Sequence, residues 1–153
     1  MGLLREIETY LNEIKAAVPG INKVVIVTEK GQLTNYLNHI DSNDNNILLA
    51  VIPNFSNNSP VSGDAYKDTA FMDISVLTYT DYSALDQEAF LDSFDSTLEQ
   101  IKLVKQKLLE DHLDQSCNLV RFLNPSSIIT TDLYNLSQCN GWTITFSFDV
   151  PLW

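Results

Sequence analysis

The chain has little of several residue types that mark special protein classes. Of its 153 residues, only two are cysteine, five are glycine and five are proline. A disulfide scaffold needs more cysteine, and collagen-like or wholly disordered chains need more glycine and proline. The apolar share of 44% is ordinary for a globular protein. Since a compact fold of this length buries roughly 70% of its unfolded surface, we expect one domain spanning residues 1–153.

Long apolar runs are also missing. The longest, VVIV at 24–27 and ILLAVI at 47–52, are far shorter than the ~20 residues that cross a bilayer. Acidic residues at 6, 8 and 13 interrupt the region that a signal peptide would occupy. We therefore expect no membrane contact and an intracellular protein. In a reducing compartment, Cys117 and Cys139 are expected to stay unpaired.

Basic residues are scarce, because nine lysines and arginines face twenty acidic residues and leave a net charge of −11. Specific nucleic-acid binding needs a basic face, so the composition argues against it. Residues 64–99 hold nine of the acidic residues and a single lysine. We interpret them as a solvated helix face and strand edge. The alternative is a negative surface that meets a basic partner or repels passing DNA.

Catalytic signatures are absent from the sequence. The two histidines, His39 and His112, lie in no recognisable motif, and the glycines are too scattered for a phosphate-binding loop. A glycosidase using the carboxylates of residues 64–99 would need two of them facing each other across a cleft. Their spacing does not indicate such a pair. We expect no enzyme, no catalytic residue, no metal and no cofactor.

Two helices are predicted from apolar spacing. The first spans about 2–18 and ends at Pro19-Gly20. The second begins at a capping box of Ser83 and Asp86 and continues to about His112. Acidic residues fill its first half and lysines follow, an order that suits the helix dipole. The lysines are Lys102, Lys105 and Lys107.

The other apolar segments predict strands. Most are short β-branched runs, and the alternation of residues 141–150 is the strongest strand signal. The sequence therefore predicts an α+β fold, with a mostly antiparallel sheet and both helices packed on one face. The predicted strands are the run that begins at residue 23 and is closed by a turn at Lys30-Gly31, and residues 47–53, 71–80, 118–123, 128–136 and 141–150.

A closing hairpin is predicted between the last two strands. Asn140-Gly141 is a favourable turn sequence. We predict a three-residue loop at 139–141, which sets Leu136 opposite Ile144 and places Gly141 in a left-handed bulge position. A two-residue turn at 140–141 is the alternative.

The polar segment at about 54–69 is predicted to be an exposed loop, because it has too little apolar surface to pack. A structureless loop of this length usually contacts a partner or a substrate, although a merely flexible excursion is the alternative. We take Asp64, Tyr66 and Asp68 as hypothetical interface residues. Trp153 joins them, since a large apolar group after a proline needs a partner or its own domain to cover it.

The order of elements is a helix, strands, a long polar loop, a strand, a long helix and a hairpin that ends in NGWTITFSFDVPLW (140–153). This order and closing strand resemble the tail terminator and neck (head-tail joining) proteins of long-tailed bacteriophages. The resemblance implies a non-enzymatic virion structural protein that is made in the host cytoplasm. It also implies a homo-oligomeric ring that joins tail tube to head, contacts other tail or neck proteins and lets DNA pass as cargo.

A second function class stays open from the charge alone. A monomeric acidic binding module, of the kind that gives immunity to a toxin or nuclease, would use the acidic stretch to neutralise a basic protein partner. Such a module would stay small and bind in a salt-dependent way.

Overall fold

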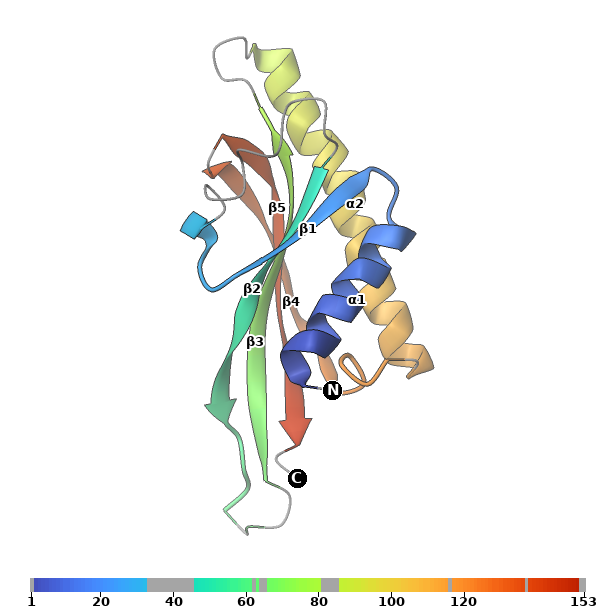
Figure 1. The fold of residues 1–153 in the computed structure, drawn as a ribbon, viewed down its shortest axis with the longest axis vertical. Helices are drawn as coiled ribbons and strands as arrows, with labels where there is room; N and C mark the ends of the chain where they lie inside the picture. The colour runs from blue at the N-terminus through green and yellow to red at the C-terminus, as the bar shows by residue number, and fades with distance from the viewer. Residues whose placement is uncertain are drawn as a thin grey trace.

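The computed structural model describes residues 2–32, 46–61, 63, 66–80, 86–115, 117–136 and 138–151. Two α-helices and five strands form these parts of the chain (Figure 1). The sheet order is β1-β2-β3-β5-β4, parallel between β1 and β2 and antiparallel elsewhere. The elements are α1 (Leu3–Ala17), β1 (Ile21–Val27), β2 (Asn46–Asn57), β3 (Lys67–Tyr79), α2 (Gln87–Asp114), β4 (Leu123–Leu136) and β5 (Cys139–Pro151).

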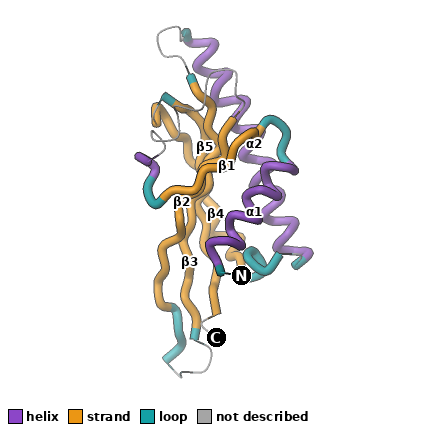
Figure 2. Tube along the Cα trace, in the orientation of Figure 1, coloured by secondary structure: helices purple, strands orange, loops and turns teal. Residues whose placement is uncertain are grey.

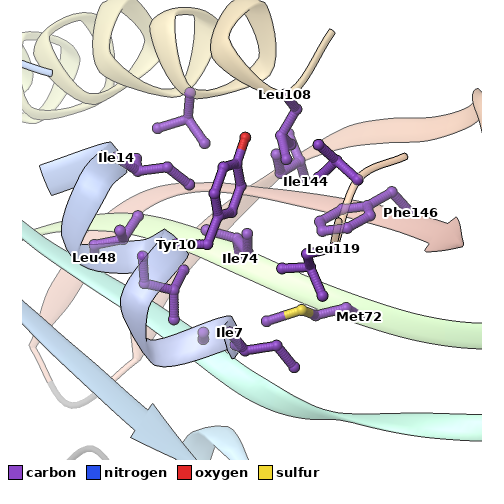
Figure 3. Close-up of a cluster of buried hydrophobic side chains, with 14 of the residues drawn as sticks. Ile7, Tyr10, Ile14, Leu48, Met72, Ile74, Leu108, Leu119, Ile144 and Phe146 are labelled. Atoms are coloured by element: carbon purple, nitrogen blue, oxygen red, sulfur yellow. The ribbon is translucent and has the colours of Figure 1, made fainter. Parts of the chain in front are cut away.

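Both helices cover the same face of the sheet, which confirms the predicted α+β architecture (Figure 2). Side chains of α1 such as Ile7 and Ile14 lie against the sheet, where they meet Leu48 and Ile74 (Figure 3). Leu108 brings α2 into the same cluster. Burial of these apolar faces is the main stabilising contribution to the fold. None of the described helices is long and apolar enough to cross a membrane.

The centre of the sheet is buried on both faces. In β2, the run Ile47–Ala50 is fully buried, with Leu48 toward the helices and Leu49 in a second cluster on the opposite face. A continuous apolar run, rather than an alternating one, is typical of a strand that has both faces covered. This explains the ILLAVI sequence.

Helix α2 begins one turn later than predicted. Its N-cap is Asp86, whose side chain accepts a hydrogen bond from the Ala89 amide at 2.7 Å, whereas Ser83 lies outside the described residues. At the other end, the His112 imidazole Nδ1 lies 2.9 Å from the Val120 carbonyl oxygen. Residues 118–122 are turns, so the predicted strand at 118–123 is wrong. The chain turns there from α2 back toward β4, and the turn buries the apolar side chains of Leu119 and Val120 in the core.

The polar segment predicted as a loop at 54–69 is shorter than expected, because both of its ends are paired strands. Strand β2 continues through Pro53 to Asn57, and β3 begins at Lys67, so the connection shrinks to 58–66. The pairing register shifts between Val51 and Asn54, and such an irregularity accommodates a proline that has no amide hydrogen to donate. Composition alone misses strands of this kind, because their pairing partners supply the stabilisation.

The predicted register of the closing hairpin is wrong. Leu136 pairs with Cys139 and Leu133 with Gly141, so β4 turns into β5 before Cys139, ahead of the predicted loop. Gly141 sits inside β5, where an added Cβ would come within 1.9 Å of the Val76 carbonyl oxygen. The glycine therefore serves close approach of β5 to β3, and the positive φ of 65° at Gln138 supplies the turn.

Candidate interaction surfaces

The outer part of the β2–β3 hairpin projects past the lower ends of both helices (Figure 1). We call residues 54–71 the arm; of these, 54–61, 63 and 66–71 are described. Its backbone is paired along Asn54–Asn57 and Asp68–Phe71, and the Asn58 amide donates to the Lys67 carbonyl at 3.0 Å. The Ser59 hydroxyl accepts from the Lys67 amide at 3.1 Å. The described arm is thus an ordered, hydrogen-bonded structure.

A carboxylate of β5 ties the arm to the sheet. One oxygen of Asp149 lies 2.9 Å from the Lys67 ammonium, and the other accepts from the Thr69 hydroxyl at 3.1 Å. The three side chains are only half-exposed, which favours an ordered contact over a purely solvated ion pair. The arm therefore holds its direction relative to β5.

The arm displays large apolar side chains to solvent. Phe55, Tyr66 and Phe71 are each about half exposed, and Val61 is fully exposed. The Tyr66 hydroxyl lies over Gly63, where an added Cβ would meet it at 2.9 Å. Phe55 lies opposite Ala70 on the helix face, whereas Phe71 lies on the other face of the hairpin. Single exposed apolar residues are normal on a protein surface, but several on one projecting hairpin, here on both of its faces, indicate a segment that contacts other molecules.

The predicted interface residues divide between the arm and undescribed parts of the chain. Tyr66 lies exposed on the arm. Asp68 is half-buried and pairs with Asn57 on one side and Val150 on the other, so its backbone belongs to the ladder. Asp64 and Trp153 lie outside the described residues. The aromatic residues Phe55 and Phe71 were missed, because the sequence pattern there is polar overall.

The first half of α2 forms an acidic surface. Residues 86–99 carry five acidic and no basic side chains, and all five are exposed. We call this the acidic half of α2. The acidic half of α2 lies beside the end of the sheet where β4 turns into β5. There the Phe90 and Tyr134 ring centroids are 5.9 Å apart, and the Phe94 carbonyl accepts a hydrogen bond from the Trp142 indole at 2.9 Å. The five are Asp86, Glu88, Asp92, Asp95 and Glu99.

The lysines of α2 do not form a matching basic surface. Lys107 pairs with Asp111 at 3.0 Å and lies over the Tyr10 ring. Three acidic residues, Glu110, Asp111 and Asp114, follow the three lysines in the same helix and cancel their charge. The charge of α2 is therefore strongly negative in its first half and near neutral in its second.

A shallow hollow of about 310 Å³ lies on the sheet face opposite the helices. Phe71 of the arm and Ile129 of β4 line it, with Thr145 and Ser147 of β5 between them. Ligand sites usually gather several converging polar groups with displaced pKa values. The one ionisable side chain in the described lining is Asp73, which forms an ion pair with Lys30 at 3.7 Å.

Two groups with displaced pKa values lie in the core. Burial raises the pKa of the Cys139 thiol to about 12. Burial also raises the pKa of Tyr10, whose hydroxyl donates to Asp111 at 2.7 Å. Both side chains are buried between packed elements, and Tyr10 also borders a small hollow beside Cys117. Among the described residues, no group of three or more His, Cys, Asp or Glu side chains is placed to hold a metal.

Comparison with known protein families finds no match to this sequence, and no curated protein matches it either.

Proposed function

We propose that this chain is a non-enzymatic assembly subunit: a tail terminator or neck ring protein that joins the tail tube of a bacteriophage to its head. The observation that carries the proposal is the arm. It is an ordered hairpin that extends beyond the helices and exposes Phe55, Val61, Tyr66 and Phe71. Burial of these side chains does not stabilise the fold, so their exposure is better explained by contact with another molecule. In the ring, the arm contacts a neighbouring copy or a tail protein.

Charge gives the proposal a second support. A ring that passes DNA benefits from an inner surface that repels phosphate, and the acidic half of α2 provides five exposed carboxylates. DNA is then a passing cargo and not a specific ligand. Asp64, Asp68 and Trp153 remain candidate contact residues in this proposal.

Negative-stain imaging of the concentrated protein tests the ring directly. The proposal predicts closed rings of one diameter, because head-to-tail contacts that close give a single cyclic species. Open fibres or single small particles at every concentration would contradict it. A variant with Phe55→Ser and Tyr66→Ser should keep the fold and lose contacts that use the arm. Leu113→Ser, on the exposed last turn of α2, is the matched control.

A second function is favoured by the same acidic half of α2. As a monomeric immunity-type module, the protein would bind a basic nuclease or toxin through these carboxylates. Replacing Asp92 and Asp95 with lysine would then abolish binding of a basic partner. In this alternative the protein is a monomer and forms no ring. Loss of the interaction at high salt supports this alternative, since exposed charge pairs are screened.

A further inference from the structure

The sheet ends on two open edges with different surroundings. Among the described residues, strand β4 pairs with β5 alone, and residues 129–132 are exposed on both faces. Ile129 and Thr131 share the face opposite the helices, while Thr130 and Asp132 are on the helix face. Ile129 is 58% exposed. A strand with an open edge, two open faces and few charges is a template for pairing with another chain.

Strand β1 is the other edge. A hollow of about 430 Å³ lies between parts of β1 and α1. It is lined by Asn12 and Lys15 of α1 and by Asn22, Lys23 and Val24 of β1. Lys15 and Lys23 have no ion-pair partner among the described residues, and Glu8 in the same hollow pairs with Arg5. In the part of the chain that the structure describes, the β1 side is therefore an unpaired edge with two cations that have no ion-pair partner.

Charge distinguishes between the ways in which two copies can join. Pairing of β4 with β4 would bring together two copies of Asp132 and two acidic halves of α2, because that part of α2 lies beside β4. Like charges that face each other are unfavourable. Pairing of β4 with β1 instead keeps the two acidic surfaces apart and places Asp132 and the acidic half of α2 on the same face as Lys15 of α1. Lys23 shares the opposite face of β1 with Ile47 and meets the Ile129 side of β4.

We infer that copies of this chain join head to tail, with β4 of one copy extending the sheet at β1 of the next. Strands β1, β2 and β5 run in one direction and β3 and β4 in the other. If the helices of both copies stay on one side, β4 therefore meets β1 antiparallel, the commoner pairing in proteins. This inference rests on the proposed ring and names the contact that builds it.

Two variants block one edge each. Ile129→Lys with Asp132→Lys puts positive charge on β4, and Lys15→Glu with Lys23→Glu puts negative charge on the β1 side. All four positions are exposed or half-exposed, so both proteins should keep the wild-type melting temperature. Leu113→Lys, an equally drastic change on the exposed end of α2, is the control for the β4 variant.

Sedimentation or light scattering over a concentration series gives the readout. We expect each blocked variant to self-associate at least about tenfold more weakly than wild type, and Leu113→Lys to behave as wild type. An equimolar mixture of the two blocked variants should recover association. The mixed contact joins β4 of one variant to β1 of the other, and the charges across it are again opposite.

Other outcomes would overturn the inference in distinguishable ways. If the β1 variant associates as wild type and only the β4 variant fails, the contact is β4 with β4. If both variants form the same rings as wild type, the contact lies elsewhere and the proposed function stands. A wild-type protein that stays monomeric throughout contradicts both the contact and self-assembly of the ring.

Discussion

The inner half of the β2–β3 hairpin and its arm share two strands, whose pairing shifts register between Val51 and Asn54, yet the two halves differ in what covers their side chains. In the inner half, Leu48 and Ile74 are buried under the helices and Leu49 and Leu77 are buried on the opposite face. In the arm, Phe55 and Phe71 are about half exposed. The inner half therefore stabilises the fold mainly through burial, while the arm buries Ala70 but is otherwise held by backbone pairing and by Asp149.

The comparison teaches that strand pairing and core formation are separable in this protein. Changes in the inner half should cost stability, whereas changes in the arm should cost contacts with other molecules.

The largest effect is expected for Gly141→Ala. The added methyl would lie 1.9 Å from the Val76 carbonyl oxygen and 3.0 Å from the Leu77 Cα, so backbone must move and the β3–β5 ladder must open. We expect a loss of about 3 kcal/mol or more, measured by urea unfolding. Gly31→Ala is the control, because its Cβ would meet only the flexible Glu29 carboxylate. Equal stability of the two variants would refute the close-approach role.

The second test compares two positions in β3 directly. Ile74 is 1% exposed, so Ile74→Ala should lower the free energy of unfolding by about 3 kcal/mol, through lost burial and a cavity. Phe71→Ala removes a larger side chain that is 51% exposed and should cost less than about 1 kcal/mol. Chemical denaturation of both variants measures the difference. A costlier Phe71 change would show that the arm belongs to the core.

The third test uses pH. Because burial raises the Cys139 pKa from 9.0 to about 12, the thiol stabilises the folded protein while it is neutral. That stability is fully present below about pH 9 and is lost as the pH rises toward about 12, with a deficit of ~2 kcal/mol near the middle of this window. Unfolding midpoints at both ends of the window measure it. Cys139→Ala should remove the part of the loss that begins near pH 9 and Cys117→Ala should not, while Tyr10, whose pKa is also raised by burial, keeps a loss above about pH 10 in both variants.

The smallest effect concerns the contact between the helices. Tyr10→Phe removes the hydroxyl that donates to Asp111, and we expect a loss of about 1 kcal/mol because Lys107 still pairs with that carboxylate. Thermal unfolding in the neutral pH range is the measurement. Thr9→Ser, a change on the exposed side of α1, should have no measurable effect, and a similar loss there would contradict the assignment.

Sequence patterns predicted the positions of the helices and strands better than they predicted which strands pair and in which register. Apolar periodicity placed both helices within a few residues, because one buried stripe is a local signal. The predicted register of the closing hairpin was wrong. Asn140-Gly141 is a typical turn sequence, but here the glycine is required for close packing against β3, a strand far away in the sequence. Tyr66 was found on the arm, but the exposed edge of β4 was not, because only the sheet order reveals which strand lies outermost.

Absolute mass by light scattering over a concentration series tests the central claim, that the exposed arm and edges serve assembly, most directly. The account predicts that the mass rises with concentration from the 17.2 kDa of one chain to a single fixed multiple of it. A mass of 17.2 kDa at every concentration would contradict it.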